Sequence, residues 1–160
     1  MNESRANRIL TALKEQGAGQ MLIVDPMSIC YLTGVSMSPF ERFYGLLLRA
    51  DGHHVYFLNR LFHVPEDVGI EKVWYSDTDP VAEIVAAHLD KHAVLGVDKD
   101  LKARFLLPLM EMHSASAFIN GSLAVDTTRG VKDEEEQEKM RVASDINDRA
   151  MAQFKTLIHE

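Results

Sequence analysis

The chain has 160 residues and a formal net charge of −7, with 46% hydrophobic and 26% charged residues. This is the composition of a single globular domain, and its acidic balance argues against electrostatic binding to nucleic acid or to an anionic membrane surface. No apolar run approaches the length of about 20 residues that spans a bilayer, and the N-terminus has no apolar signal core. The single cysteine, Cys30, excludes an internal disulfide and fits a reducing compartment. We therefore expect a cytoplasmic protein that binds neither nucleic acid nor membrane.

The first half of the chain carries the apolar patterns of two helices and four short strands. The helices are expected at residues 3–16 and 27–34, and the strands at 20–25, 43–50, 54–59 and 71–76. Asp51-Gly52 separates two of these strands and is a strong signal for a hairpin with a type I′ turn, in which both central residues have positive φ. At least one antiparallel pair of strands is therefore expected.

The second half alternates helices with strands. Asp79 and Pro80 are expected to begin one helix, and Asp100 to cap another, which Pro108 should kink or break. The remaining elements are expected as strands at 93–98 and 114–121, a polar connection at 121–130 and a long helix from residue 133. Helices interleaved with short, almost fully apolar strands predict an α/β fold. We expect a three-layer domain with a mixed sheet of about five to six strands and helices on both faces.

The last helix has a strong start and an open end. Asp133 and Glu136 form a capping-box pattern, and an apolar stripe runs from Met140 to Leu157 at helical spacing. The helix pattern reaches Glu160 with no glycine, proline or cap to end it. We therefore expect the chain to be the first part of a longer protein.

Three groups of side chains could in principle hold a metal ion. His88 and His92 are four residues apart on an expected helix, the spacing of two zinc ligands, but the glutamate that a zinc protease places after the first histidine is missing. The aspartate pairs in SDTDP and VDKD could bind Mg²⁺, although aspartate is also the expected residue before a helix. A partly buried helix histidine and ordinary helix caps account better for these residues, so no metal site is predicted in this chain.

The loop before residues 43–50 carries the remaining candidates, Phe40, Glu41 and Arg42. They offer a stacking surface, an acceptor and a fixed cation at the start of a strand. The alternative is an ordinary loop, in which Phe40 packs on the core and the two charged side chains meet solvent. The sequence contains no nucleophile elbow and no phosphate-binding glycine loop, so its patterns alone do not indicate catalysis by this chain.

Four segments, in order along nearly the whole chain, resemble the N-terminal domain of the creatinase, prolidase and aminopeptidase P family. They are RANRILTALKEQGAGQMLIVDPMSICYLTGV, ERFYGLLLRADGHHVYFL, GVDKDLKARFLLPL and TTRGVKDEEEQEKMRVASDINDRAM. In the last segment Arg129, Val131 and Lys132 resemble the junction that precedes the family's catalytic domain. The resemblance implies that residues 1–128 form the N-terminal domain. It implies that residues 129–160 are the linker and first helix of a truncated C-terminal catalytic domain.

The resemblance implies the activity of a whole protein rather than of this chain. In the family's peptidases, a "pita-bread" catalytic domain holds two divalent metal ions (Mn, Co or Zn) on two aspartates, a histidine and two glutamates. None of these ligands can be placed on this sequence, so no catalytic or metal-binding residue is expected here. The implied parent is an Xaa-Pro dipeptidase (prolidase) or Xaa-Pro aminopeptidase that hydrolyses peptides through a metal-activated hydroxide. This domain alone should be inactive.

Family members are commonly homodimers in which the N-terminal domain of one subunit approaches the active site of the other. An aromatic residue or histidine, followed by an acid and an arginine, recurs on the loop that reaches across, and Phe40, Glu41 and Arg42 match this pattern. The resemblance therefore implies that Phe40 closes the pocket's apolar wall. Arg42 would bind a substrate carboxylate, or pair with Glu41 to fix the loop. Two alternatives remain: the N-terminal domain of a creatinase-like amidinohydrolase, which does not need the metals, and a non-catalytic protein-binding module.

Overall fold

The computed structural model describes residues 1–158. Its helices are α1 (Glu3–Glu15), α2 (Pro26–Thr33), α3 (Val81–Ala86), α4 (Ala103–Glu111), α5 (Ser122–Gly130) and α6 (Glu134–Leu157). Its strands are β1 (Gln20–Ile23), β2 (Gly45–Arg49), β3 (Val55–Asn59), β4 (Glu71–Tyr75), β5 (Val94–Val97) and β6 (Ala117–Asn120). The chain divides into two compact units, the first ending at Arg129 and the second beginning at Gly130.

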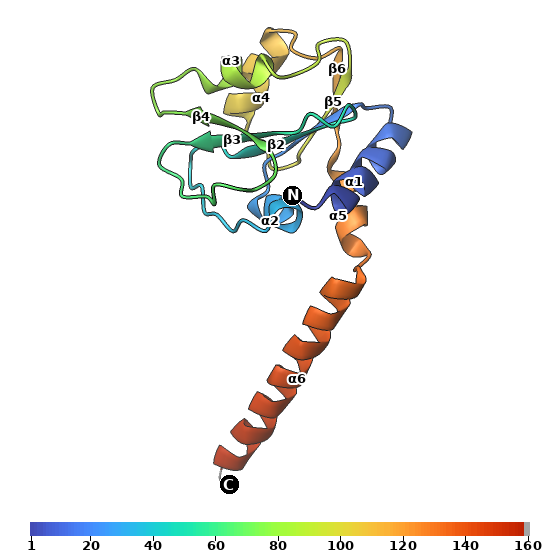
Figure 1. The fold of residues 1–160 in the computed structure, drawn as a ribbon, viewed down its shortest axis with the longest axis vertical. Coiled ribbons are helices and arrows are strands. Elements are labelled where there is room, and N and C mark those ends of the chain that lie inside the picture. The colour runs from blue at the N-terminus through green and yellow to red at the C-terminus, as the bar shows by residue number, and fades with distance from the viewer. Residues whose placement is uncertain (159–160) are drawn as a thin grey trace. The chain divides into compact units, whose positions relative to one another are not determined.

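A six-stranded mixed sheet forms the centre of the first unit (Figure 1). The strand order is β4-β3-β2-β1-β5-β6, and among the described strands only β2 runs antiparallel to its neighbours. The carboxyl ends of the other strands therefore lie on one edge of the sheet, together with the amino end of β2. This topology confirms the predicted α/β fold with a mixed sheet.

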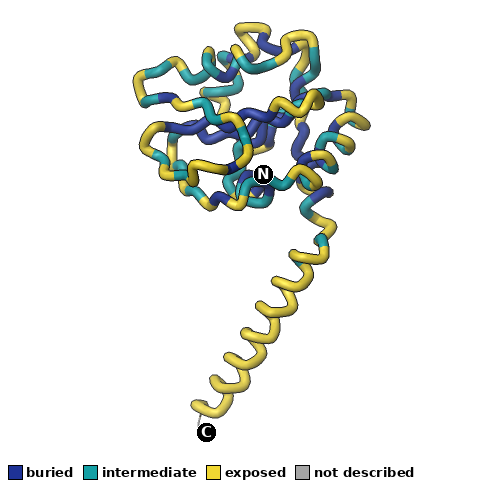
Figure 2. The backbone as a smooth tube through the Cα atoms, viewed as in Figure 1, coloured by how far each residue is buried: buried dark blue, intermediate teal, exposed yellow. Residues whose placement is uncertain are grey.

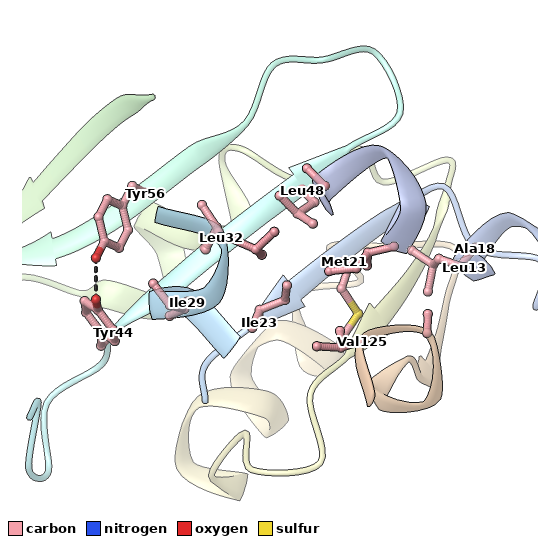
Figure 3. Packing of buried hydrophobic residues seen from close by; sticks show 14 of the residues in the cluster. Leu13, Ala18, Met21, Ile23, Ile29, Leu32, Tyr44, Leu48, Tyr56 and Val125 are labelled. Atoms are coloured by element: carbon pink, nitrogen blue, oxygen red, sulfur yellow. Dashed lines mark hydrogen bonds between the residues drawn. The ribbon is translucent and has the colours of Figure 1, made fainter. Parts of the chain in front are cut away.

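Helices cover both faces of the sheet, because alternate side chains of a strand point to opposite faces. On one face, α1, α2 and α5 pack against the strands in a cluster that includes Met21, Ile29 and Val125 (Figure 3). On the other face, α3 and α4 contribute Val85 and Leu109 to a second cluster. The result is the expected three-layer arrangement.

The central strands are apolar along their whole length because both of their faces are covered. Every residue of β1 and β3 is buried, whereas the edge strands β4 and β6 are partly exposed, as the burial colours of Figure 2 show. Tyr44 and Tyr56 share a hydrogen bond between their hydroxyl groups inside the core (Figure 3). This pairing satisfies two polar groups that burial would otherwise penalise.

The hairpin predicted at Asp51-Gly52 is present, but its turn is not type I′. The strands β2 and β3 pair antiparallel on either side of it. Gly52 has a φ of 81°, but Asp51 is not among the described non-glycine residues with positive φ. The Asp51 carboxylate instead accepts the backbone N–H of His53 at 3.0 Å. A longer, side-chain-stabilised loop therefore closes the hairpin.

Both predicted aspartate caps in the second half are wrong. The Asp79 carboxylate accepts the N–H of Ser76 at 2.6 Å and makes no cap hydrogen bond to α3, whose cap position is Pro80. Asp100 does not cap α4, because that helix begins after Lys102. Asp79 stabilises the connection before α3 rather than the start of the helix, and the Asp100 backbone N–H donates to Asp98 at 3.1 Å.

Two further expectations concern α4 and α5. Pro108 does not break α4, which continues to Glu111; this proline lies in the last turn, where few backbone hydrogen bonds depend on it. Residues 121–130, expected as a polar connection, contain α5. The helix forms because Ala124 and Val125 are buried in the core, despite the serine, threonine and glycine around them.

The second unit contains α6, which begins with the predicted capping box. The Asp133 carboxylate accepts the N–H of Glu136 at 2.9 Å, and the Glu136 carboxylate accepts the N–H of Asp133 at 3.1 Å. No residue of α6 is buried. The predicted end of this helix at Glu160 lies outside the described residues. None of the helices in residues 1–158 has the length and apolar character needed to cross a membrane.

Candidate functional site

The loop that carries Phe40, Glu41 and Arg42 lies at the carboxyl edge of the sheet. It connects α2 with β2, and the antiparallel direction of β2 places the beginning of that strand where β1 and β3 end. The strand β4 ends at the same edge, because it runs parallel to β3. Open α/β sheets bind their ligands beyond this edge.

Local backbone geometry turns the loop out of α2. Gly34 has a φ of 74°, and its N–H donates to the Cys30 carbonyl at 2.8 Å, which ends the helix. Glycine suits this position because it adopts left-handed backbone without steric cost. Further along, the Arg42 N–H donates to the Pro39 carbonyl at 3.1 Å and closes a second turn. The candidate residues therefore lie on a short, internally bonded loop.

Arg42 forms a two-point ion pair with Asp77, the second residue after β4. Its Nε and Nη2 donate to Oδ1 and Oδ2 of Asp77, each at 2.8 Å. Asn59, the last residue of β3, is fully buried, and its Nδ2 donates to Oδ1 of Asp77 at 2.7 Å. Asn59 at the end of β3 and Asp77 just after β4 therefore hold the guanidinium of Arg42, which lies before β2.

Glu41 is a second carboxylate beside Arg42. Its Oε1 lies 3.4 Å from Nη1 of Arg42, and its side chain is 67% exposed. The predicted pairing of these two residues is therefore present, but Asp77 holds the guanidinium at shorter distances and at two points. Glu41 is the partner that solvent reaches more easily.

Phe40 does not pack on the core, so the ordinary-loop alternative is wrong for this residue. Its side chain is 80% exposed, and its φ is 55°, in the left-handed region. A non-glycine residue in that region costs on the order of 1 kcal/mol. Lys102 donates from Nζ to the Phe40 carbonyl at 3.2 Å and supports this conformation from the start of α4.

Arg42 lines two hollows at this edge of the sheet. The first has a volume of about 240 Å³ and is mainly apolar, lined among others by Phe40, Phe43 and Lys102. The second has a volume of about 580 Å³ and lies against Asp77 and the segments of α3 and α4. A guanidinium beside an apolar hollow can bind an acidic group whose apolar part lies in that hollow.

The electrostatics of the site keep its charged pair ionised. The hydrogen bond from Arg42 lowers the pKa of the Asp77 carboxyl, and the Asn59 amide lowers it further. Burial raises the pKa of Tyr75 to about 12, so this residue is neutral at physiological pH. The Tyr75 hydroxyl donates to the Phe43 carbonyl, which joins the end of β4 to the segment before β2.

The two histidines considered as zinc ligands do not share a helix, so that part of the prediction is wrong. The helix α3 ends at Ala86, before His88 and His92. The ring of His88 packs against Phe57, and its Nδ1 lies 2.8 Å from the Ile84 carbonyl. His88 is therefore part of the packing beneath α3.

The predicted aspartate pairs are also engaged within the protein. Asp98 is buried, and its Oδ2 accepts the backbone N–H groups of Val24 and Asp25 at 3.1 and 3.0 Å. Asp77 is held by Arg42, as described above. Within residues 1–158, no group of three or more His, Cys, Asp or Glu side chains is placed to hold a metal ion.

Sequence reasoning missed Asp77 and Asn59 as members of this site. The sequence pattern indicates only that Asp77 precedes a helix, and its partner Arg42 is 35 residues away. The available signal was Asn59, a polar residue inside the apolar run HVYFLN. A buried amide needs hydrogen-bond partners, so its position predicts a polar network at the end of that strand.

A family model and a curated relative both match most of this chain. A family model described as the Creatinase/Prolidase N-terminal domain matches residues 5–131. An uncharacterized peptidase of Staphylococcus aureus is 26% identical over 153 residues, which cover 92% of this chain and 42% of the relative. The chain therefore spans less than half of the length of the curated relatives it matches.

Solved structures share the fold. The prolidase from Thermococcus sibiricus has a TM-score of 0.84 at 20% identity, and the match covers 98% of this chain and 44% of that one. The creatinase/prolidase N-terminal domain of an X-Pro dipeptidase from Streptococcus pyogenes has a TM-score of 0.65 at 24% identity. That match covers 79% of this chain and 99% of the solved domain.

Proposed function

Because this chain belongs to the creatinase/prolidase N-terminal domain family, we propose that it is the non-catalytic N-terminal domain of a metal-dependent Xaa-Pro dipeptidase or aminopeptidase. The curated relatives are named as peptidases, and the chain covers 42% of their length. Both facts support a parent protein in which other residues carry out catalysis. Proline specificity rests on the family and on the structural neighbours, which are named as a prolidase and an X-Pro dipeptidase.

One observation carries the proposed role of this domain. The loop from residue 36 to residue 42 presents Phe40, Glu41 and Arg42 together at the carboxyl edge of the sheet, with Phe40 exposed in a strained backbone conformation. Strain at an exposed aromatic residue does not help a domain to fold, and such strain is typical of binding sites. We assign this loop to the substrate pocket of a partner subunit.

Each side chain of the loop has a role in this proposal. Arg42 binds the carboxylate of a short peptide, because a guanidinium matches a carboxylate in fork geometry. Phe40 forms an apolar wall beside the substrate. Glu41 supplies an acceptor next to Arg42 and leaves it when the substrate carboxylate arrives.

The metal ions of this proposal would be held by the part of the C-terminal catalytic domain that follows residue 160. Two divalent ions, Mn, Co or Zn, would there activate the water that attacks the peptide bond. We assign to the present chain the binding and orientation of the substrate, and to the catalytic domain the cleavage of the bond.

The assembly proposed for the parent is a cytoplasmic homodimer. A homodimer is required because the loop serves the active site of the other subunit rather than its own. Residues 129–160 are assigned to the linker and the first helix of the catalytic domain. The capping box of Asp133 and Glu136 gives that helix a defined start.

The proposed activity is tested by assaying the full-length protein against a panel of Xaa-Pro dipeptides and tripeptides. The protein is first treated with a chelator and is then assayed with and without Mn²⁺. We expect cleavage that Mn²⁺ restores. The preferred peptide length then distinguishes a dipeptidase from an aminopeptidase.

Two other outcomes would contradict the proposal. Hydrolysis of creatine-like substrates that survives the chelator would indicate a creatinase-like amidinohydrolase. An absence of any hydrolysis, with or without metal, would favour a non-catalytic protein-binding module.

A further inference from the structure

Resting on the function proposed above, we infer that Asp77 and Asn59 are positioning residues that hold Arg42 ready for a substrate carboxylate. Neither residue is expected to touch the substrate. They act by restricting the guanidinium to one orientation, so that its remaining donors face the incoming acid. This assigns part of substrate selection to the ends of β3 and β4, outside the loop itself.

The geometry of the guanidinium carries the inference. An arginine side chain has two edges that can form a fork with a carboxylate, one with Nε and Nη2 and the other with Nη1 and Nη2. Asp77 occupies the first edge at 2.8 Å and 2.8 Å. On the second edge, Nη1 lies 3.4 Å from the exposed Glu41 carboxylate. A substrate carboxylate therefore meets a donor edge whose direction is already set, and Glu41 is the group it displaces.

Asn59 gives the arrangement a rigid base. Its Nδ2 donates to Asp77 at 2.7 Å, and its Oδ1 accepts the N–H of Leu61 at 3.0 Å. The amide thus has a partner at each end, and it is anchored on β3 opposite Tyr75 of β4. A fully buried amide in these contacts cannot rotate freely, so the Asp77 carboxylate is held in place from the core side.

A purely stabilising role does not explain this arrangement. The Arg42 and Asp77 side chains are 27% and 51% exposed, so solvent screens much of the stability that their ion pair supplies. Orienting such a pair is useful to binding, because a pre-oriented group loses less conformational entropy when the ligand arrives.

The test uses the full-length protein, an Xaa-Pro dipeptide with a free carboxylate and the same dipeptide as its C-terminal amide. Arg42→Ala should raise the KM for the free acid about tenfold, the size of one charge-assisted hydrogen bond, and change the KM for the amide little. Asp77→Asn should raise the KM for the free acid roughly three- to tenfold, with kcat near the wild-type value. The double variant should be no worse than Arg42→Ala, because Asp77 acts through Arg42.

Asp126→Asn is the matched control, because it breaks another exposed ion pair, with Lys99 at 2.5 Å, whose carboxylate is on α5 and not bonded to Arg42. Its kinetics should equal those of the wild type. The inference is overturned if Asp77→Asn leaves the KM for the free acid unchanged while Arg42→Ala raises it. Additive effects in the double variant would also overturn it.

A second readout separates this inference from the proposed activity. If the full-length protein cleaves no peptide, the proposed function fails, and the orientation of Arg42 is then measured by NMR in the 160-residue chain. A slowly exchanging Arg42 Nε–H signal that is lost in Asp77→Asn and kept in Asp126→Asn supports positioning by Asp77. Equal exchange in all three proteins overturns it, and the backbone spectrum of each variant reports whether it is folded.

Discussion

Two phenylalanines three positions apart differ in their roles: one packs in the core, and the other is exposed on the loop. Phe43 is 3% exposed, and its ring packs edge-on against Phe57 and Phe105 in the second core cluster. Phe40 is 80% exposed and has left-handed backbone. The same side chain therefore supports the core at one position and is available to a ligand at the other.

This difference predicts opposite phenotypes for two alanine variants. Phe43→Ala should reduce the free energy of unfolding by about 3–5 kcal/mol, as expected for a truncated core aromatic. Phe40→Ala should change it by less than about 0.5 kcal/mol, because little of the ring is buried. Urea denaturation of both variants measures the free energies. A large loss of stability in Phe40→Ala would show that the ring supports the fold and would weaken its assignment to a substrate pocket.

Single residues also mark the limit of what the sequence predicts in this site. The exposure of Glu41 and its contact with Arg42 follow from their positions on a polar loop. The pairing of Arg42 with Asp77 does not, because it depends on β2, β3 and β4 ending or beginning at the same edge. Such pairs become visible only once the strand order is known.

At the level of elements, apolar patterns predicted every strand of the sheet and most of its helices. The patterns succeed because strands covered on both faces must be apolar throughout. They fail for α5, whose composition favours a turn and whose helix depends on burying Ala124 and Val125. They fail for the aspartate caps of α3 and α4, since an aspartate before a helix can equally bond to the preceding turn.

The closure of the β2–β3 hairpin depends on a buried histidine and should respond to pH. His54 is buried, and its Nδ1 accepts the backbone N–H of Arg49 at 3.1 Å, which requires the ring to be neutral at that nitrogen. Burial lowers the pKa of His54 below its usual value of 6.5, although the nearby Glu3 and Asp51 carboxylates oppose this shift. The unfolded chain therefore binds a proton more readily than the folded one. The contribution of this residue to stability is complete above pH 6.5 and is lost as the pH falls toward the folded pKa.

The prediction is that the wild type loses more stability between about pH 7.5 and about pH 5.5 than the His54→Gln variant does. Glutamine keeps an acceptor near the Arg49 N–H but does not titrate. His53→Gln, at the neighbouring exposed position, should retain the wild-type pH dependence. Urea midpoints at the two pH values measure the effect. An equal loss of stability between these pH values in the wild type and in His54→Gln would contradict the assignment.

At the level of the whole molecule, the domain is a scaffold that presents one loop. The sheet and its two helical layers form the carboxyl edge. At this edge Asn59 bonds to Asp77, and Asp77 holds the guanidinium of Arg42. The family model matches residues 5–131, which include the whole of this scaffold apart from the first residues of the chain. We assign the proposed activity to a longer protein, and we propose that in it the loop completes the substrate pocket of another subunit.

The most direct test of this account is complementation between subunits in the full-length protein. One subunit carries Arg42→Ala with an intact catalytic domain, and the other carries the native loop with a catalytic domain inactivated at a metal ligand. In the mixed dimer the native loop can serve the intact active site only if it acts across the interface. The account predicts that mixing restores the wild-type KM for an Xaa-Pro dipeptide. A KM that stays at the Arg42→Ala value after subunit exchange would contradict the account.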